Sequence, residues 1–332
     1  MNITLIYNLV TSVSRGQPED ILADQDSVKT AEAVAKNLRL AGNEVELLSI
    51  DEKNIGHLKE RKTDLFFNQA FGINSLPKTE YQVAEALAAT GVPYTGSDAK
   101  AILLTTDKIA TKELLLKNGV PTPKFQRFKN CREEINPELA FPLIAKPSNE
   151  DCSLGIDSLS VLTTKKQAYG KIEKICKAYV EPTLVEEYIP GRELNVSILG
   201  NGLKAEILPI SEIIFGPSFK GKFQVVDFAA KWFEDSVAYR ETTGVCPAKL
   251  DPAVQKEVEE VAKKAFLLTG CRDYARVDIR LSTDGTPYVL EVNANPGIGP
   301  EDGMIRSAKA AGYTYSRFLQ QIIDVAKLRF RV

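Results

Sequence analysis

The sequence predicts an N-terminal α/β lobe with a parallel sheet, followed by a larger α+β region. Two observations lead to this fold class. Up to about residue 97, strand-like apolar runs alternate with helical patterns, as in parallel strands joined by right-handed crossovers. Further along, Asp284-Gly285 stands between alternating runs at 276–281 and 287–293, which predicts an antiparallel hairpin with a tight two-residue turn.

The elements of the first lobe, residues 1–97, follow from apolar periodicity. They are strands at 3–10, 44–50 and 64–68 and helices at 28–40 and 80–90, with a polar loop before the first helix and a strand and turn at 91–97. We take that strand and turn as the first domain boundary.

The middle region, residues 98–190, combines helices with strands that end in charged residues. It contains predicted helices at 98–118 and 165–178, strands at 141–148 and 183–189, and a polar loop at 149–155. Pro121 and Pro123 mark the exit of the first helix.

The last region, residues 191–332, holds a second hairpin candidate, a long irregular stretch and three helices. The hairpin is predicted at 194–199 and 203–210, and the helices at 252–268, 304–312 and 315–328. Between them, residues 213–245 show little periodicity, and so long a loop in a compact protein is usually functional.

Composition is that of an ordinary soluble globular protein. Of the 332 residues, 44% are hydrophobic and 26% charged, and the formal net charge is −2. No run approaches the ~18 apolar residues of a membrane span, no signal peptide is visible, and no basic block favours nucleic acid or an anionic membrane. We expect a cytoplasmic protein with small-molecule partners, no nucleic acid and no membrane.

Cysteine and histidine usage excludes several kinds of site. The five cysteines are odd in number and contain no Cys-x-x-Cys pair, so reduced thiols are expected rather than a disulfide framework or a zinc site. His57 is the single histidine and stands in a charged stretch. A histidine-based triad or multi-histidine metal site is thereby nearly excluded.

The Asp-Gly hairpin carries the strongest chemical signal. With Asp284 and Gly285 as the turn, Asp278 lies opposite Glu291 on the polar face. The same register places Arg276 opposite Asn293 there, and it puts Val277, Ile279 and Leu281 on the core face with Val292, Leu290 and Tyr288.

Two carboxylates facing each other should repel, so a compensating charge is expected. A hard cation such as Mg²⁺ suits an all-oxygen set of Asp278, Glu291 and Asn293, which favours a Mg²⁺-nucleotide site. Alternatively, Arg276 and Arg280 neutralise the acids in a structural cluster. Arg276 could also stabilise a developing oxyanion, and the turn after the hairpin could supply a backbone N–H for the same purpose.

Other candidate ligands are spread over the middle region. Lys108 and Lys146 could straddle nucleotide phosphates, although single lysines at element ends are usually solvated. The loop at 149–155 could cover phosphates or be a plain turn. Strand 185–189 could offer an exposed edge to adenine, with Glu186 or Glu187 near its amino group and Glu193 near the ribose, or could be an ordinary edge strand. Lys231 could contact phosphate or be plain surface.

Together these segments resemble the ATP-grasp superfamily, and most closely its D-alanine–D-alanine ligase branch, over about residues 91–330. The segments that carry the resemblance are Val92-Pro93-Tyr94-Thr95-Gly96-Ser97, Thr106-Asp107-Lys108, Ile144-Ala145-Lys146-Pro147-Ser148, Val185-Glu186-Glu187-Tyr188-Ile189, Cys246-Pro247-Ala248, Ala275-Arg276-Val277-Asp278 and Leu290-Glu291-Val292-Asn293-Ala294-Asn295-Pro296-Gly297. The last two are the most specific.

The resemblance implies an ATP-dependent carboxylate–amine ligase that works through an acyl phosphate and joins small amino acids. It implies ATP contacts at Lys108, Lys146, Glu186, Glu187, Ile189, Glu193, Lys231 and Leu290, two Mg²⁺ ions, or alternatively Mn²⁺, at Asp278, Glu291 and Asn293, and catalytic roles for Arg276, Ser153 and Gly297. A homodimer is left open.

The chain departs from the branch where the amino acids would bind. Of the N-terminal Glu-Val-Ser motif only Val13-Ser14 is present, and residues 68–72 lack the usual histidine-glycine. Asp151-Cys152-Ser153 replaces glycine-serine-serine, and Trp232 replaces a tyrosine. A catalytically weak ATP-binding module, or a ligase for another amino acid or dipeptide, is therefore the alternative.

Overall fold

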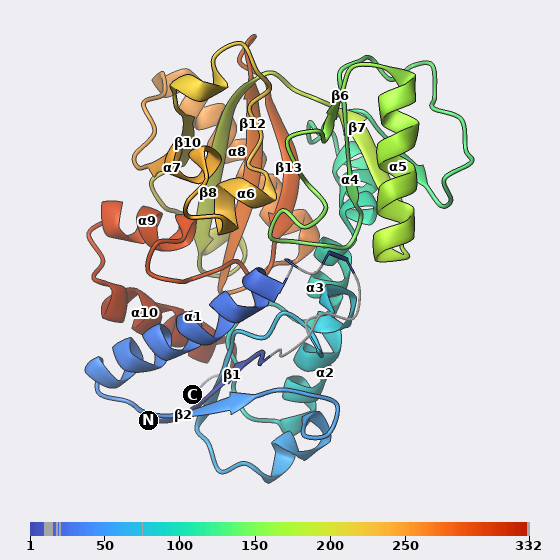
Figure 1. Cartoon of the computed structure of the whole chain (residues 1–332). Helices are drawn as coiled ribbons and strands as arrows, with labels where there is room; N and C mark the ends of the chain where they lie inside the picture. Colours follow the sequence, from blue (N-terminus) through green and yellow to red (C-terminus); the bar gives the residue numbers. More distant parts are fainter. Residues whose placement is uncertain (10–15, 18, 20, 75, 331–332) are drawn as a thin grey trace.

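Three β-sheets follow one another along the chain (Figure 1). They belong to a computed structural model that describes residues 1–9, 16–17, 19, 21–74 and 76–330. Short 3₁₀ helices occur at Ile55–Glu60, Pro77–Thr79, Gly202–Lys204 and Pro217–Phe219. Within the described residues, no helix is long and apolar enough to cross a membrane.

The first sheet is parallel, as predicted. Its order is β2-β1-β3, with β1 at Asn2–Tyr7, β2 at Glu44–Ser49 and β3 at Leu65–Asn68, and helices α1 (Ile21–Leu40) and α2 (Glu80–Thr90) follow β1 and β3. Helix α1 begins at Ile21 rather than at residue 28. Its early turns carry Asp26, Ser27 and Thr30, which face a cavity, so apolar periodicity does not mark them.

The predicted helix at 98–118 is two helices, α3 (Ala99–Thr106) and α4 (Lys108–Lys117). Asp107 ends the first in an extended conformation and caps the second, because its carboxylate accepts hydrogen bonds from the backbone N–H groups of Ile109 and Ala110. The break places Lys108 at the first position of α4.

The second sheet has the order β4-β7-β5-β6 and is covered by α5 (Lys165–Tyr179). Its strands are β4 (Phe125–Phe128), β5 (Leu143–Pro147), β6 (Val161–Leu162) and β7 (Thr183–Glu187). The prediction of an exposed strand edge is wrong for residues 185–187, because β7 is hydrogen-bonded to both β4 and β5, and residues 188–189 lie beyond the strand. Strand β4 was not predicted, because its four residues are too few to show a clear alternation of apolar and polar side chains.

The third sheet is antiparallel with the order β11-β10-β8-β12-β13. Its strands are β8 (Gly191–Leu199), β10 (Ser211–Phe215), β11 (Thr242–Val245), β12 (Tyr274–Ser282) and β13 (Pro287–Asn293), and β9 (Glu206–Ile207) pairs with β8. The stretch 213–245 is therefore no structureless loop. It also contains α6 (Phe228–Trp232) and α7 (Val237–Arg240), elements too short to show a period.

The turn of the β12–β13 hairpin differs from the prediction. Ser282 donates its backbone N–H to the carbonyl of Thr286, and Gly285 donates to the carbonyl of Ser282. Three residues form the loop, and Gly285 takes the left-handed conformation, with φ 91°, that glycine favours in such loops. The prediction of a two-residue turn is therefore wrong.

A β-bulge after Asp278 shifts the strand register by one residue and restores the predicted pairing at the end of the hairpin away from the turn. Asp278 pairs with Glu291, as predicted, whereas Ile279 pairs with Val289 instead of Leu290. The core face therefore carries Val289, which is fully buried. Leu290 is the extra residue of the bulge and faces the cavity.

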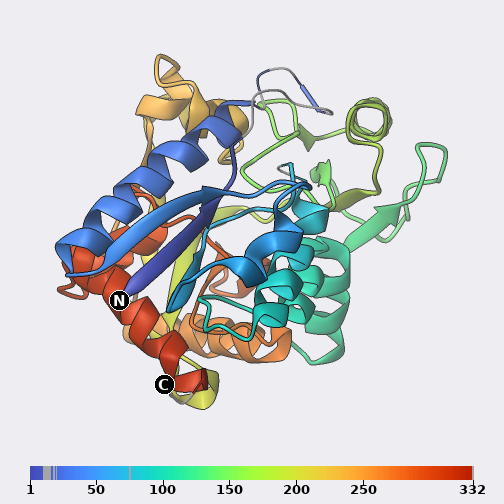
Figure 2. The same cartoon turned by 90° about the horizontal axis from the view of Figure 1, so that it is seen from below.

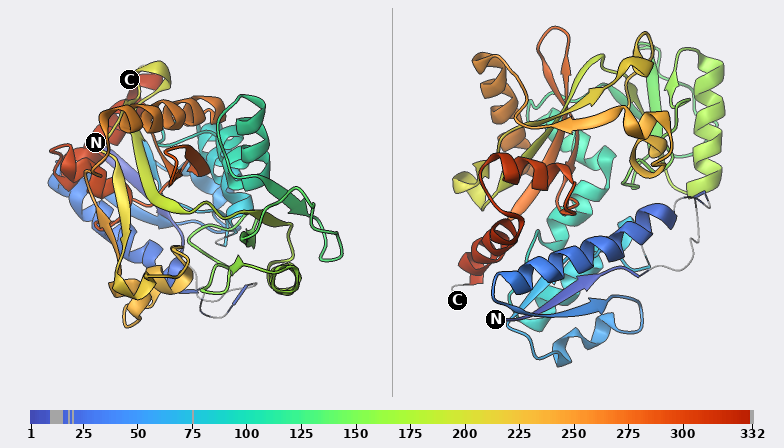
Figure 3. Two further views of the ribbon diagram at one scale, coloured as in Figure 1. Left: turned by 90° about the horizontal axis from the view of Figure 1, so that it is seen from above. Right: turned by 60° about the vertical axis from the view of Figure 1, so that its left-hand side comes forward.

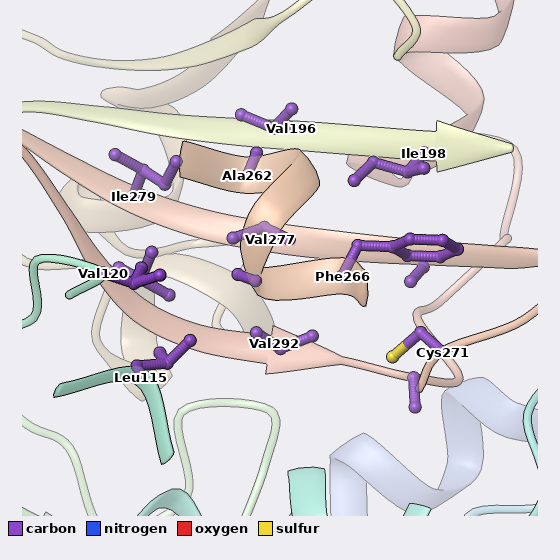
Figure 4. Close-up of a cluster of buried hydrophobic side chains, with 14 of the residues drawn as sticks. Leu115, Val120, Val196, Ile198, Ala262, Phe266, Cys271, Val277, Ile279 and Val292 are labelled. Carbon is purple, nitrogen blue, oxygen red and sulfur yellow. The ribbon is translucent and has the colours of Figure 1, made fainter. Parts of the chain in front are cut away.

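Hydrophobic cores join segments across the predicted domain boundaries. Figure 4 shows Leu115 of α4 and Phe266 of α8 (Pro252–Thr269) packed with the buried face of β8, β12 and β13. A second cluster joins Leu5 of β1 to Phe318 of α10 (Tyr315–Phe330). Helix α10 therefore lies beside α1, and both termini lie on the same side of the molecule (Figures 2 and 3).

Candidate active site

One cavity of about 540 Å³ lies among the second sheet, the third sheet, α1 and α9 (Gly303–Ala310). Every site residue expected from the sequence lines it: Lys108, Lys146, Ser153, Glu186, Glu187, Ile189, Glu193, Lys231, Arg276, Asp278, Leu290, Glu291, Asn293 and Gly297. Segments almost 190 residues apart, from Lys108 to Gly297, thus meet at one place.

Asp278 is surrounded by donors on the polar face of the hairpin. Arg276 binds it with two hydrogen bonds, of 2.7 Å from Nε and 2.8 Å from an Nη atom. Asn195 donates to the carboxylate at 2.7 Å and Asn293 at 3.1 Å. Burial would lower the pKa of Arg276, but Asp278 outweighs it and the pKa is raised, so this arginine stays charged.

Glu291, opposite Asp278, is partly buried and is ionised. Burial would raise its pKa, but Lys108 and Lys146 hold the pKa well below the usual range. The Nζ atom of Lys108 lies 3.6 Å from the Glu291 carboxylate. Arg276 and Lys108 therefore compensate the two acids. Of the two arginines in the alternative that the sequence left open, only Arg276 does so, because Arg280 binds Glu193.

The same residues fit a hard divalent cation. Among the described residues no group of three histidine, cysteine or acidic side chains converges, so the third ligand would be the amide oxygen of Asn293. That amide contacts both Asp278 and Glu291, and an amide can present either its nitrogen or its oxygen. Two carboxylates and an amide oxygen are the donor set that Mg²⁺ prefers.

Lys108 reaches the loop 149–155 from the start of α4. Its Nζ atom donates to the carbonyl of Glu150 at 2.6 Å and to the carboxylate of Asp151 at 2.9 Å. Burial would lower the pKa of Lys108, but Asp151 and Glu291 raise it, so the ammonium is charged.

Glu186 is held between two lysines rather than offered to a ligand. It accepts contacts of 2.6 Å from Lys146 and from Lys112, and all three side chains are almost fully buried. Burial lowers the pKa of Lys112 to about 8 despite this partner. Sequence reasoning missed Lys112, although it stands four residues after Lys108, one helical turn away.

Beyond β7 the cavity wall is tied together by Arg280. Its guanidinium donates to the carbonyl of Ile189 at 2.9 Å, to Glu193 at 2.8 Å and to the hydroxyl of Tyr188 at 2.9 Å. Burial raises the pKa of Glu193. Glu187 accepts a hydrogen bond from the backbone N–H of Ala140 at 2.8 Å.

The loop 149–155 is joined to the segment around α6. The Ser153 hydroxyl donates to the carbonyl of Val226 at 2.8 Å, and the Trp232 indole donates to the carbonyl of Cys152 at 3.1 Å. Cys152 and Ser153 adopt positive φ angles of 56° and 62°. Lys231 on α6 faces the same part of the cavity.

The cavity is also lined by acids and an arginine that sequence reasoning missed. Glu80 is buried, accepts a 2.9 Å hydrogen bond from Asn295 and has its pKa raised to about 8 by burial. Asp302 accepts from the backbone N–H of Gly299 at 2.6 Å, and Arg306 lies one turn further along α9. These residues occur in no motif, and the fold alone brings them to the cavity.

Comparison with known proteins agrees with this geometry. Residues 114–324 match the family described as D-ala D-ala ligase C-terminus. A Bordetella petrii protein named D-alanine–D-alanine ligase is 32% identical over 92% of this chain and 89% of its own length. The chain belongs to the D-alanine–D-alanine ligase family. It is thus a member of the ATP-grasp superfamily, as the sequence motifs indicated.

Two further proteins are similar to this chain over most of its length. A Sinorhizobium fredii protein, named uncharacterized protein y4sG, is 34% identical over 91% of this chain and 88% of its own length. The solved Bacillus anthracis D-alanine–D-alanine ligase, complexed with ATP, superposes with a TM-score of 0.77 at 25% identity, covering 100% of this chain and 99% of that one. Val13-Ser14, where the family motif is altered, lies outside the described residues.

Proposed function

We propose that the chain is an ATP-dependent ligase that joins the carboxylate of one small amino acid to the amine of another. The observation that carries the proposal is the convergence of two lysines, an arginine and an acidic pair in one cavity. The relatives named D-alanine–D-alanine ligase make D-alanine the first candidate for both substrates.

The reaction would run in two balanced steps. A carboxylate oxygen attacks the γ-phosphorus of ATP, forming an acyl phosphate and releasing ADP. The neutral amine of the second substrate then attacks the acyl carbon, phosphate leaves, and a proton is lost from nitrogen. Positioning and charge stabilisation supply most of the acceleration in such transfers.

Each expected residue has a role in this scheme. Lys108, Lys146 and Lys231 would bind phosphates, and Ser153 would hold the loop that covers them. Glu187, Ile189 and Leu290 would surround the base, Glu186 would position Lys146 rather than contact the base, and Glu193 would hold the ribose. Arg276 and the backbone N–H of Gly297 would face the oxyanion of the tetrahedral intermediate. Asp278, Glu291 and Asn293 would hold Mg²⁺, which when bound neutralises phosphate charge.

An amino-acid panel tests the proposal. Phosphate release from ATP is measured with D- and L-amino acids, and products are identified by mass spectrometry. A ligase shows release that depends on the acceptor, and Glu291→Gln should abolish it. Release that no amino acid stimulates would favour a catalytically weak ATP-binding module, and unchanged release in the variant would overturn the metal assignment. The cytoplasmic location and the homodimer stay predictions.

A further inference from the structure

Arg280 is a buried arginine in the wall of the cavity, with 3% of its surface exposed. It lies on β12 two residues after Asp278, so both side chains are on the same face of the strand. Strand β8 runs beside β12 (Figure 1), and its register sets Asn195 opposite Asp278 and Glu193 opposite Arg280. The Arg280–Glu193 pair therefore lies one step along the polar face from the carboxylate proposed to hold Mg²⁺.

The Arg280–Glu193 pair lies between the places proposed for the two ends of a nucleotide. On one side is Asp278, where Mg²⁺ would hold the phosphates. On the other side is Ile189, next to the proposed base site, whose carbonyl accepts a hydrogen bond from Arg280 at 2.9 Å. In a nucleotide the ribose joins the phosphates to the base. Glu193, which lines the cavity between these places, therefore faces the position of the ribose.

Arg280 binds one of the two carboxylate oxygens of Glu193. Its Nη1 atom donates to Oε2 at 2.8 Å, and within the described part of the chain Arg280 is the one hydrogen-bond partner of this carboxylate. The Oε1 atom is left to accept a hydrogen bond from a ligand. Burial raises the pKa of Glu193, Arg280 opposes that rise most strongly, and the charges of Asp278, Lys231 and Glu291 have smaller effects of both signs.

The guanidinium of Arg280 is itself held on three further sides. Its Nε atom donates to the carbonyl of Ile189, and an Nη atom donates to the hydroxyl of Tyr188 and to the carbonyl of Gln224. The guanidinium carbon also lies 5.3 Å from the centroid of the Tyr188 ring. Because a guanidinium is planar, these contacts fix the direction of the remaining N–H groups, which a lysine ammonium could not do. Glu193 is thereby held in one orientation.

We propose that Arg280 is a positioning residue that keeps Glu193 ionised and directed at the ribose, and thereby makes this site selective for nucleotides that carry ribose hydroxyls. Arg280 acts through Glu193. A hydroxyl that donates to a carboxylate forms a stronger hydrogen bond than one that donates to a neutral carboxyl group, so the charge of Glu193 sets the strength of the preference. This inference rests on the proposed function, because it takes Glu193 as the group that meets the ribose of ATP.

Binding of ATP and of 2′,3′-dideoxy-ATP tests Arg280 without turnover. The full-length protein is titrated calorimetrically with each nucleotide in the presence of Mg²⁺ and without amino acids. The two nucleotides differ only in the hydroxyls that Glu193 would accept. Wild-type protein should bind ATP about ten- to hundredfold more tightly than the dideoxy form, and in Arg280→Met this ratio should fall by about tenfold. Arg280→Lys, which keeps the charge without the planar fork, should give an intermediate ratio.

Arg192→Met is the matched control. Arg192 precedes Glu193 on β8 and binds Glu212 with two hydrogen bonds of 2.7 Å, and neither residue is among the described residues that line the cavity. This variant should keep the wild-type ratio. Equal affinities in the wild type, an unchanged ratio in Arg280→Met, or an equal loss of affinity for both nucleotides in that variant would each overturn the role of Arg280.

Two further outcomes separate this inference from misfolding and from failure of the proposed function. If Arg280→Met does not fold, Arg280→Lys decides, because a wild-type ratio in that variant would overturn the positioning role. A wild-type protein that does not bind ATP would overturn both the inference and the proposed nucleotide site. A ribose preference that Arg280→Met reduces, with no acceptor-dependent phosphate release in the wild type, would support the role of Arg280 and overturn the ligase function alone.

Discussion

Glu80 is the first residue of α2, and burial keeps its side-chain carboxyl group neutral. It is 5% exposed, and burial raises its pKa to about 8, although the Asn295 amide favours the charged form. In the unfolded chain the same group would ionise near its ordinary value of 4.5. Protonated Glu80 therefore stabilises the fold below that value, and the contribution is lost as the pH rises through about 8.

We expect Glu80→Gln to flatten the pH dependence of stability. The amide cannot ionise, so the variant should gain stability relative to wild type as the pH rises from 5 to 8.5. Urea unfolding at several pH values measures this difference. Glu85→Gln, on the same helix, is the control and should follow the wild-type curve. A parallel curve for Glu80→Gln would mean that Glu80 is already ionised in the native state.

Lys112 is a buried, ion-paired lysine that sequence analysis did not identify. Its spacing of four residues from Lys108 is a weak signal, and exposed lysines are far commoner than buried ones. Only the fold places it 2.6 Å from Glu186 and from the hydroxyl of Thr122. Lys112 and Lys146 therefore hold the two oxygen atoms of the Glu186 carboxylate.

At the scale of elements, α6 and the loop 149–155 form one connected part of the cavity wall. The Trp232 indole and the Ser153 hydroxyl each donate to a carbonyl of the opposite segment, and these two bonds join parts of the chain about 75 residues apart. Both segments line the cavity where Lys231 lies.

We expect Trp232→Phe to weaken ATP binding while leaving the fold intact. Loss of one hydrogen bond costs about 0.5–1.5 kcal/mol, so KM for ATP should rise by up to about tenfold. Steady-state kinetics and a melting curve measure the two effects. Phe233→Leu, at the exposed neighbouring position, is the control. An unchanged KM in Trp232→Phe would show that the loop and α6 are not coupled through this bond.

The hairpin shows how far periodicity determines an element. Alternation fixed the two strands and the facing of Asp278 and Glu291, since both depend on the period of a strand. It could not reveal the bulge, because one inserted residue leaves each flanking run alternating. Leu290 was therefore placed in the core by the hairpin pattern, although the resemblance assigned it to the ATP site, where the structure exposes it to the cavity.

For the whole molecule, Arg329 of α10 anchors the C-terminal helix across the lobes. It binds Asp273, which is fully buried, at 2.7 and 2.8 Å, and it donates to the backbone carbonyls of Tyr94 and Gly96. One side chain thus joins α10, the entry to β12 and the end of the first lobe.

We expect Arg329→Gln to destabilise the protein by about 3–5 kcal/mol, because it leaves the Asp273 carboxylate buried without its partner. Thermal and urea unfolding measure the change. The double variant Asp273→Asn/Arg329→Gln removes the charge and should recover part of the loss, whereas Lys327→Gln should be near neutral. A loss below about 1 kcal/mol in Arg329→Gln would contradict the anchoring role.

The sequence by itself determined the family, the order of the longer strands and helices, and the residues expected at the ATP and metal half of the site. These depend on local periodicity and on motifs whose spacing is visible along the chain. Only the tertiary structure decided the position of β7 inside its sheet, the bulge at Leu290 and the presence of Glu80, Asp302 and Arg306 in the cavity lining. Those features arise from contacts between distant segments, and burial, pairing and charge are properties of such contacts rather than of any single stretch.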